Sequence, residues 1–483
     1  MNISGLDLTI LIVYLFGVVA FGLWMGRNQK TAADFMVGSR NFPWWVILFS
    51  IVATETSTVT FLSIPGLAWA TDLTFLQLPL GYIVGRLLVC MVLLPRYFKG
   101  EMFTAYEVLH VRFGGQVKRF ASLLFIVTRT LGDGLRLFLS AIVLERVFSI
   151  DIEIAVICLG VATILYTFVG GMRAVLWTDL VQFVVYMGGA VIAFCILIGE
   201  IDGGFGTVNE LATQTDKLRV FNFDFNFSQP YLFWTGLIGG AVFAVGTHGV
   251  DQMMVQRYLC ARNLRDARKA LAWSGPVVLL QFAFFLVVGV ALYAFYQQNP
   301  QTFDKPDRVF ATFIVSHLPI GVLGLVLGAV FSAAMSTLSS SLNSTATAIV
   351  NDVYVLPERE TKDALRLRLA RSFTIVFGVA QIAVGIGGQL VEGTPIVGMV
   401  LHIQGFTTGI ILGVFFLATV TADSRAAITG LVGGLVVVTF VEFGAPAIWP
   451  SFSLAWPWFV LVGSAATFAI GLGARSVLRW RGI

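Results

Sequence analysis

Charged side chains are scarce in this chain of 483 residues: 12% of the residues are Asp, Glu, Lys or Arg, and 57% are hydrophobic. Soluble domains carry about 25% charged residues, so this composition, with a mean hydropathy of +0.86, excludes an ordinary soluble protein. Cysteine is also rare. Its four copies, Cys90, Cys158, Cys195 and Cys260, lack the spacing of a metal site, which argues against a zinc centre or a disulfide framework.

Long apolar runs fill most of the chain. A helix needs about 20 apolar residues to cross the hydrocarbon core of a bilayer. The first run has no basic segment before it and no cleavage signal after it, so we expect a retained helix and not a signal peptide. The thirteen expected spans are 6–26, 44–70, 74–97, 120–147, 152–170, 177–199, 231–254, 270–297, 318–350, 367–389, 394–420, 425–445 and 453–475.

The basic residues indicate how these spans are oriented. If the N-terminus lies outside, inside loops hold 23 of the 31 Lys and Arg residues, among them the cluster from Arg257 to Lys269, and outside loops hold 5. Lys and Arg concentrate in cytoplasmic loops of membrane proteins. We therefore expect the N-terminus outside and the C-terminus inside, in the inner or plasma membrane.

A few charges fall inside the expected spans: Arg86, Arg129, Arg136, Glu55, Asp133 and, at an inner edge, Asp179. A charge at this depth costs several kcal/mol unless it is paired or hydrated. Asp133 lies four residues after Arg129 and three before Arg136, so both arginines can share a helix face with it. The cluster either locks the fourth span to its neighbours or lines a solute pathway.

Two spans look interrupted. The second carries Glu55, the hydroxyl run 56–58 and the pair Pro65–Gly66, and the seventh surrounds Thr247–His248 with four glycines. Each span is either a kinked structural helix or a broken one that frees backbone carbonyls for a ligand. Two interrupted spans five apart favour an inverted-repeat transporter.

The chain then divides into five expected segments. Two of them are five-helix repeats, and the others are peripheral helices or a connector too short for a soluble domain. The segments are 1–43 (peripheral first helix and inside loop), 44–199 (first repeat), 200–230 (outside connector), 231–420 (second repeat) and 421–483 (two peripheral helices and a basic tail).

The ninth span is unusually polar. Between Ser332 and Thr345, eight of fourteen residues are Ser or Thr, and Ser336, Ser339 and Ser340 can share one helix face. We call this stretch, 332–345, the seam. Neutral oxygens without a carboxylate suit a hard monovalent cation better than zinc, copper, calcium or magnesium. Sodium binding is the sharper interpretation, and hydroxyl packing between helices is the alternative.

Six stretches resemble those of the sodium:solute symporter family, in the family's order. That family includes sodium-coupled carriers of proline, sugars, pantothenate, sialic acid, iodide and monocarboxylates. The stretches are DFMVGSRNFPWW (34–45), TETSTVTFLSIPG (54–66), TAYEVLHVRFG (104–114), FVGGMRAVLWTDLVQ (168–182), GTHGVDQMMVQRYLCARNLRDAR (246–268) and SAAMSTLSSSLNSTATAIVNDVY (332–354).

The resemblance implies an all-α, LeuT-like fold with a 5+5 inverted repeat, and it implies sodium sites. The first would use backbone carbonyls of Ala53, Thr56 and Ala333 with the hydroxyls of Ser336 and Thr337. A second site occurs in some members of the family. It would use Asp179, Ser336, Ser339 and Ser340.

The resemblance also indicates which residues face the solute. A sugar is disfavoured because Thr247–His248 stands where the sugar carriers have large aromatics, and a carboxylate would pair with Arg136 or His248. The expected solute-binding residues are Glu55, Ser57, Thr58, Thr247, His248 and Gln404.

We therefore expect a sodium-coupled symporter of a small organic solute, such as a carboxylate, vitamin or similar nutrient, that works by alternating access. Its expected partners are the solute, sodium ions and the lipid bilayer. No cofactor other than the coupling ion, no nucleic acid and no enzymatic activity are indicated. A proton-coupled transporter of the same fold, with Asp179, Glu55 or His248 as proton carrier, is the first alternative. The second is a membrane sensor module, although no kinase core follows the last span.

Overall fold

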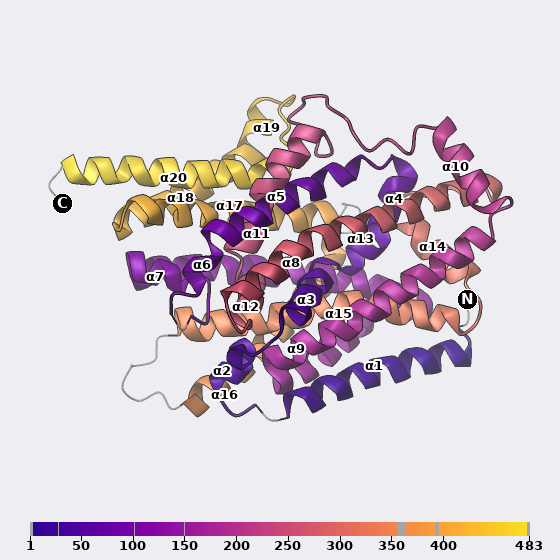
Figure 1. Cartoon of the computed structure of the whole chain (residues 1–483), viewed down its shortest axis with the longest axis horizontal. Helices are drawn as coiled ribbons and strands as arrows, with labels where there is room; N and C mark the ends of the chain where they lie inside the picture. Colours follow the sequence, from indigo (N-terminus) through magenta and orange to yellow (C-terminus); the bar gives the residue numbers. More distant parts are fainter. Residues whose placement is uncertain are drawn as a thin grey trace.

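The computed structural model of the chain describes residues 3–480 apart from 28, 101, 149, 355–362 and 392–395. The described residues form helices and no strand, and their one isolated bridge joins Phe42 to Ala261. Most long helices run along the long axis of the molecule, and the two termini lie at opposite ends of it (Figure 1).

The helices are numbered in chain order. The N-terminal half holds α1 (Gly5–Gly26), α2 (Ala32–Val37), α3 (Trp44–Glu55), α4 (Thr58–Ala70), α5 (Gln77–Val92), α6 (Leu94–Tyr97), α7 (Glu107–Phe113), α8 (Gly115–Phe148), α9 (Ile152–Gly199) and α10 (Gly204–Gln214). The C-terminal half holds α11 (Gly240–Gly249), α12 (Gln252–Leu259), α13 (Leu264–Gln298), α14 (Arg308–His317), α15 (Val322–Ala348), α16 (Asp363–Gly387), α17 (Ile396–Val420), α18 (Ser424–Thr439), α19 (Ala445–Ile448) and α20 (Pro457–Trp480). Short 3-10 segments are η1 (Gly38–Arg40), η2 (Thr74–Leu76) and η5 (Gly388–Val391), and π-helical segments are η3 (Thr235–Gly239), η4 (Ile349–Val353) and η6 (Phe440–Gly444).

Nine helices of the described chain are long and apolar enough to cross a membrane, or ten if α3 and α4 count as one bent span. The sequence predicts thirteen spans, and the difference has identifiable sources. The charged α8 and the short pair α11 and α12 are not among the nine, and α9 counts once although two expected spans fall within it.

The long helix α9 is kinked at Gly171. A straight helix of its 48 residues would be about 72 Å long, more than twice the hydrocarbon thickness. Gly171 has φ +48, which favours glycine, and an added Cβ would lie 2.6 Å from the carbonyl oxygen of Phe35. The kink therefore separates the stretches expected as the fifth and sixth spans.

Both expected interruptions exist: the first lies in the hydroxyl run 56–58 and not at Pro65–Gly66, and the second lies just after the glycine-rich stretch. Helix α3 ends at Glu55 and α4 begins at Thr58, so the break falls at Thr56 and Ser57 while Pro65 lies inside α4. The second break falls at residues 250–251, between α11 and α12.

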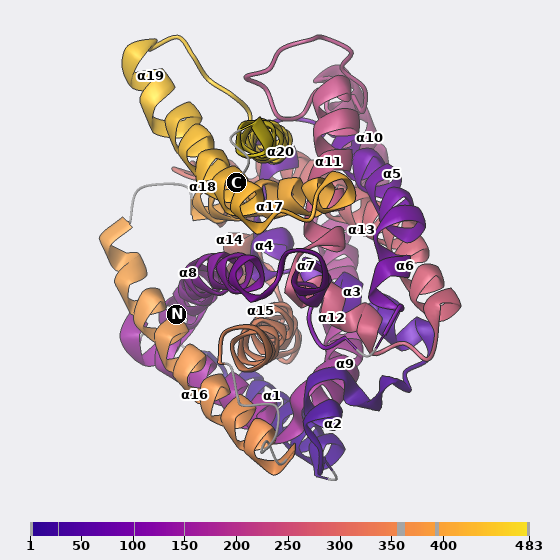
Figure 2. The same ribbon diagram turned by 90° about the vertical axis from the view of Figure 1, so that its left-hand side faces the viewer.

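Helix α15, which contains the seam, lies inside the bundle. It is surrounded by α1, α8, α9 and α16 when the molecule is viewed along its length (Figure 2). Every residue from Val326 to Ala348 is buried. The carboxylate of Asp7 in α1 accepts hydrogen bonds from the backbone N–H groups of Gly321 (2.7 Å) and Gly324 (2.8 Å) at the start of α15. The first helix is thus attached directly to the seam helix.

Candidate ion and solute sites

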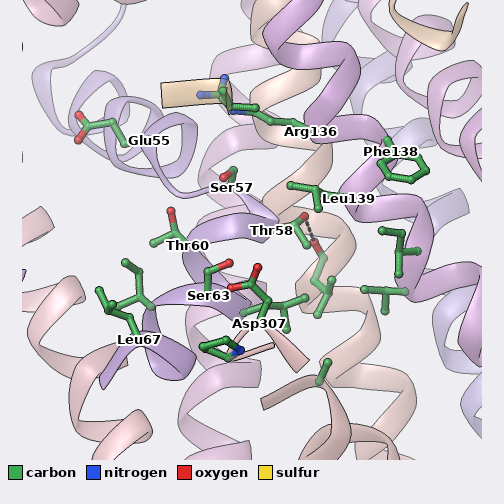
Figure 3. A pocket seen from close by; sticks show the side chains of 18 of the residues that line it. Glu55, Ser57, Thr58, Thr60, Ser63, Leu67, Arg136, Phe138, Leu139 and Asp307 are labelled. Carbon is green, nitrogen blue, oxygen red and sulfur yellow. Dashed lines mark hydrogen bonds between the residues drawn. The ribbon is translucent and has the colours of Figure 1, made fainter. Parts of the chain in front are cut away.

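A cavity of about 960 Å³ lies at the break between α3 and α4. Its walls come from both halves of the chain, chiefly α4, α8, α11, α14 and α17. The segment 304–308, which leads into α14 at Arg308, also lines it, and there the cavity reaches the surface, because the side chain of Asp304 is 57% exposed. Figure 3 shows Asp307 of this segment near Ser63 of α4.

All the residues expected to bind solute line this one cavity. Glu55, Ser57 and Thr58 come from the break and the start of α4, and Arg136 and Phe138 line the cavity from α8. Residues far apart in sequence therefore meet here. The members of the expected set that α11 and α17 contribute are Thr247, His248 and Gln404.

Glu55 belongs to a buried charge cluster at the edge of the cavity. Its carboxylate forms an ion pair with Arg86, and its Oε1 lies 3.1 Å from Nε2 of His248. The other ring nitrogen of His248, Nδ1, lies 2.8 Å from the hydroxyl of Tyr258. The imidazole of His248 thus lies between the carboxylate of Glu55 and the hydroxyl of Tyr258. The charge of Glu55 is already balanced by Arg86, so it leaves little uncompensated negative charge in the cavity.

Arg136 presents a cationic group to the cavity. Its side chain is 15% exposed, whereas Arg86 is fully buried and Arg129 is 4% exposed. Arg136 pairs with Asp133, and its Nη2 donates to Oε1 of Gln404 at 3.0 Å. The cluster expected from the α8 sequence is therefore both an internal ion-pair network and part of the cavity wall.

The residues of the first expected sodium site meet between α3 and α15. The hydroxyl of Ser336 lies 2.9 Å from the carbonyl oxygen of Ala53 and 3.2 Å from that of Ala333. The hydroxyl of Thr337 lies 3.1 Å from the carbonyl oxygen of Thr54, a residue absent from the sequence-based set. These oxygens are neutral and buried, so their chemistry suits sodium.

Thr56 stands one turn beyond Ala53, where α3 ends. Its backbone N–H donates to the carbonyl oxygen of Val52 at 3.1 Å, and its hydroxyl donates to the same oxygen at 3.0 Å. Thr56 caps α3 with extended backbone angles (φ −86, ψ 100), so its carbonyl no longer follows the helix direction that the carbonyl of Ala53 follows.

The second expected site already contains a cation, the guanidinium of Arg257. Arg257 is 1% exposed and donates to Thr54, to Ser340 and, at 3.2 Å, to Oδ2 of Asp179. It also donates to Ser50 at 2.9 Å. The sequence pattern assigned Arg257 to an inside loop, and that prediction is wrong, because α12 carries it into the protein interior.

One side of this site remains unpartnered. Oδ1 of Asp179 and both amide atoms of Gln182 are buried without a hydrogen-bond partner among the described residues. Asp179 and Gln182 lie three residues apart on α9, and the hydroxyl of Ser339 bonds only the carbonyl oxygen of Ser336, at 3.2 Å. Asp179 thus turns one oxygen toward Arg257 and leaves the other free.

Much of the seam is satisfied within α15. The hydroxyls of Ser344 and Thr345 both bond the carbonyl oxygen of Ser341, at 3.0 and 2.8 Å. Such bonds back to the preceding turn are common for Ser and Thr in helices. The count of eight hydroxyls therefore overstates the polar surface that other helices meet. Ser336, Thr337 and Ser340 reach the end of α3, Ser340 through the hydroxyl of Thr54 at 3.4 Å.

Several cavity residues were not predicted as site residues, and a charged pair stands out among them. Arg129 and Asp251 line the cavity at the end away from residues 304–308 and form an ion pair there. Each residue is a charge in an apolar stretch of the sequence, and this was the available signal. The sequence did not show that the two charges pair across distant helices.

Comparisons with known proteins agree on one family. The profile of the sodium:solute symporter family matches residues 35–436. The chain is 30% identical over 455 residues to the sodium/sialic acid symporter NanT of Aliivibrio fischeri, covering 91% of this chain and 88% of that protein. It is 28% identical over 453 residues to the human sodium-coupled monocarboxylate transporter 2, covering 91% and 72%. A solved substrate-bound, outward-open structure of a Na+-coupled sialic acid symporter matches with a TM-score of 0.88 at 26% identity and covers 98% of both chains.

Proposed function

This chain belongs to the sodium:solute symporter family, and we propose that its solute is a small carboxylate held in the cavity between Arg136 and the start of α4. The protein is a multi-pass membrane transporter, not an enzyme, and it couples the movement of sodium to that of a small solute. One observation carries the proposal. Among the core arginines Arg86, Arg129 and Arg136, the side chain of Arg136 is the most exposed, so it is the most accessible to a ligand.

The start of α4 supports the same assignment. The first N–H groups of a helix have no partner within the helix, and its N-terminus carries a partial positive charge. Ser57 precedes α4 and makes no side-chain cap, so these donors remain available beside the cavity. A carboxylate bound there would accept from Arg136, displacing Gln404, and from the N–H groups at the start of α4. The two relatives named above transport sialic acid and monocarboxylates, which carry carboxyl groups.

Sodium, in this proposal, binds between α3 and α15 to Ala53, Thr56, Ala333, Ser336 and Thr337. The support is the convergence of neutral, buried oxygens from both helices, beginning two residues before Glu55 at the cavity edge. An ion there would hold the broken helix against α15 and keep the solute site formed. No other cofactor is proposed.

A second sodium would bind to Asp179, Ser336, Ser339 and Ser340. Its support is the unpartnered Oδ1 of Asp179, and its obstacle is Arg257 on the opposite oxygen. In this proposal the sodium ion binds Oδ1 of Asp179, while the guanidinium of Arg257 stays on Oδ2.

We further propose thirteen spans with the N-terminus outside, the C-terminus inside, and residues 44–199 and 231–420 as inverted repeats. The termini at opposite ends of the molecule (Figure 1), the kink at Gly171 and the corresponding breaks after α3 and α11 support this topology.

Uptake into proteoliposomes tests the solute class. With an inward sodium gradient, we expect carboxylates to accumulate and their amides not to, and Arg136→Gln to abolish accumulation of the carboxylates. Arg308→Gln is the matched control, because Arg308 also lines the cavity but is 40% exposed and pairs with Asp304 at its mouth. Equal uptake of acids and amides would refute the carboxylate, and uptake driven by a pH gradient without sodium would refute sodium coupling.

A further inference from the structure

Helix α8 carries a polar stripe along its whole length. At 100° per residue, these side chains fall within about 60° of one another around the helix. The residues are Lys118, Ser122, Arg129, Asp133, Arg136 and Ser140. Arg136 lines the cavity, and Ser140 lies 2.9 Å from Thr58, which also lines it; Lys118 lies at the other end of the helix, toward α7. If the stripe served solute binding alone, it would not extend beyond Arg136 toward Lys118. The polar residues between Arg136 and Lys118 therefore need another explanation.

The cavity ends at the ion pair between Arg129 of α8 and Asp251. Both side chains are buried, with 4% and 7% exposure. Asp251 stands in the break between α11 and α12 and caps α12, since its carboxylate accepts from the N–H of Met253 at 2.9 Å. The pair therefore joins α8 to the half-helix that can tilt at the break.

A second, much smaller void lies beyond this pair. Its volume is about 10 Å³, and it shares Arg129, Asp251 and Gln404 with the large cavity. On its far side it is lined by Tyr106, which precedes α7, and by Thr407 of α17. The three shared residues are thus the partition between the two spaces.

Polar groups continue from the small void toward Lys118. The hydroxyls of Tyr106 and Ser122 and Oδ2 of Asp352 are buried without a hydrogen-bond partner in the part of the chain that the structure describes. Lys118 closes the series at 3.5 Å from Asp352. Unpartnered buried polar groups are costly, and several in a row along one helix face indicate a route that is hydrated in another state of the protein.

We propose that the solute leaves the cavity along the α8 stripe, past Ser122 to Lys118, and that the Arg129–Asp251 pair is the gate that closes this route. The proposal rests on the assignment of the cavity as the solute site. From Arg129 to Lys118 the route is about 16 Å long, given eleven residues at 1.5 Å each.

The charges explain how an anion passes the gate. When α12 tilts, Asp251 leaves Arg129, which keeps Asp133 at 3.8 Å and has an unpartnered Nη1. The solute carboxylate then takes the place of Asp251 on Arg129. A neutral solute would leave a buried arginine only partly compensated, which is unfavourable, so the gate opens most readily for an anion.

Cysteine accessibility tests the route. Ser122→Cys lies on the stripe, and Ala121→Cys, equally buried and 100° away around α8, is the matched control. Each is introduced into the full chain, alone and with Asp251→Asn, and a membrane-impermeant methanethiosulfonate is added from the Lys118 side. Peptide-resolved mass spectrometry separates each new thiol from the native cysteines. Asn at 251 can still cap α12, so this change removes the ion pair selectively.

We expect Asp251→Asn to raise the modification rate at Ser122→Cys by about tenfold or more, the ratio equivalent to about 1.4 kcal/mol, and to leave Ala121→Cys unchanged. An unchanged rate at Ser122→Cys, or an equal rise at both positions, would overturn the proposal. If Asp251→Asn does not fold, Arg129→Gln breaks the same ion pair from α8, and no rise at Ser122→Cys in that variant would overturn the route. Replacing sodium by potassium in the Ser122→Cys chain should also raise the rate severalfold by releasing the outward-open state.

The two proposals fail in different ways. A rise with Asp251→Asn but none on sodium removal would leave the gate intact and contradict the sodium assignment. Loss of carboxylate selectivity in uptake, with the gate response intact, would contradict the solute class alone.

Discussion

The substitution Ser336→Ala separates ion binding from folding. In the structure, the hydroxyl of Ser336 bridges the two helices of the proposed sodium site, 2.9 Å from the carbonyl oxygen of Ala53. Its removal takes away one of about five neutral oxygens around the ion and leaves the backbone carbonyls in place. We expect a transporter that folds but responds to sodium only at much higher concentrations.

The magnitudes of the two effects differ. One neutral hydrogen bond contributes about 0.5–1.5 kcal/mol to stability, so the thermal midpoint should fall only slightly. Loss of a group that merely orients a metal ligand lowers metal affinity about 10–100-fold, and loss of a direct ligand should cost at least as much. The sodium concentration for half-maximal uptake should therefore rise about tenfold or more. A tenfold loss of affinity is about 1.4 kcal/mol, which is less than the driving force of about 2.3 kcal/mol that a membrane potential of 100 mV supplies per charge.

Ser344→Ala is the control. Ser344 lies on the same helix and is equally buried, but its hydroxyl bonds only the carbonyl oxygen of Ser341 in its own helix. Both variants are assayed for sodium-dependent uptake in proteoliposomes and for thermal stability with and without sodium. If Ser336→Ala retains the sodium dependence of Ser344→Ala, the proposed site is wrong.

Two further predictions concern the scaffold. Gly171→Ala should lower the thermal midpoint and the yield of folded protein, because φ +48 and the carbonyl oxygen 2.6 Å from the added Cβ both disfavour a side chain there. Gly188→Ala on the same helix is its control: a Cβ there meets open space, so the midpoint should stay unchanged or rise. Asp7→Ala should cost about 1–3 kcal/mol by leaving two N–H groups of α15 without their acceptor, whereas Asp224→Ala at an exposed position should change stability by under about 0.5 kcal/mol. Equal losses for either variant and its control in a thermal unfolding assay would contradict these assignments.

The helical segments could be predicted closely because hydropathy over some 20 residues is a property of the sequence alone. The expected first span, 6–26, differs by one residue from α1 (Gly5–Gly26). The breaks were harder to locate. The glycines of the seventh span lie there for close packing, since a Cβ on Gly246 would meet Thr408 at 2.5 Å and one on Gly249 would meet Leu93 at 2.5 Å.

The site was predictable in its chemistry and less so in its partners. Oxygen-rich stretches and isolated charges stand out in an apolar sequence, which is why Glu55 and Ser336 could be named. The position of Arg257 could not be predicted, because charge counting treats every arginine beyond an apolar run as a loop residue. Its burial depends on five hydrogen bonds; one lies within α12, and the four to α3, α9 and α15 form only after the helices assemble.

The guanidinium of Arg257 has a consequence for the half of the cycle in which nothing is carried. In the proposed cycle, Asp179 still faces the fixed positive charge of Arg257 after sodium leaves, so this carboxylate is not bare in the empty protein. A bare carboxylate moving across the membrane would meet about 2.3 kcal/mol of electrical work per 100 mV. With the pair intact, the membrane potential acts on the arriving ion, and the return of the empty carrier is electrically silent at this position.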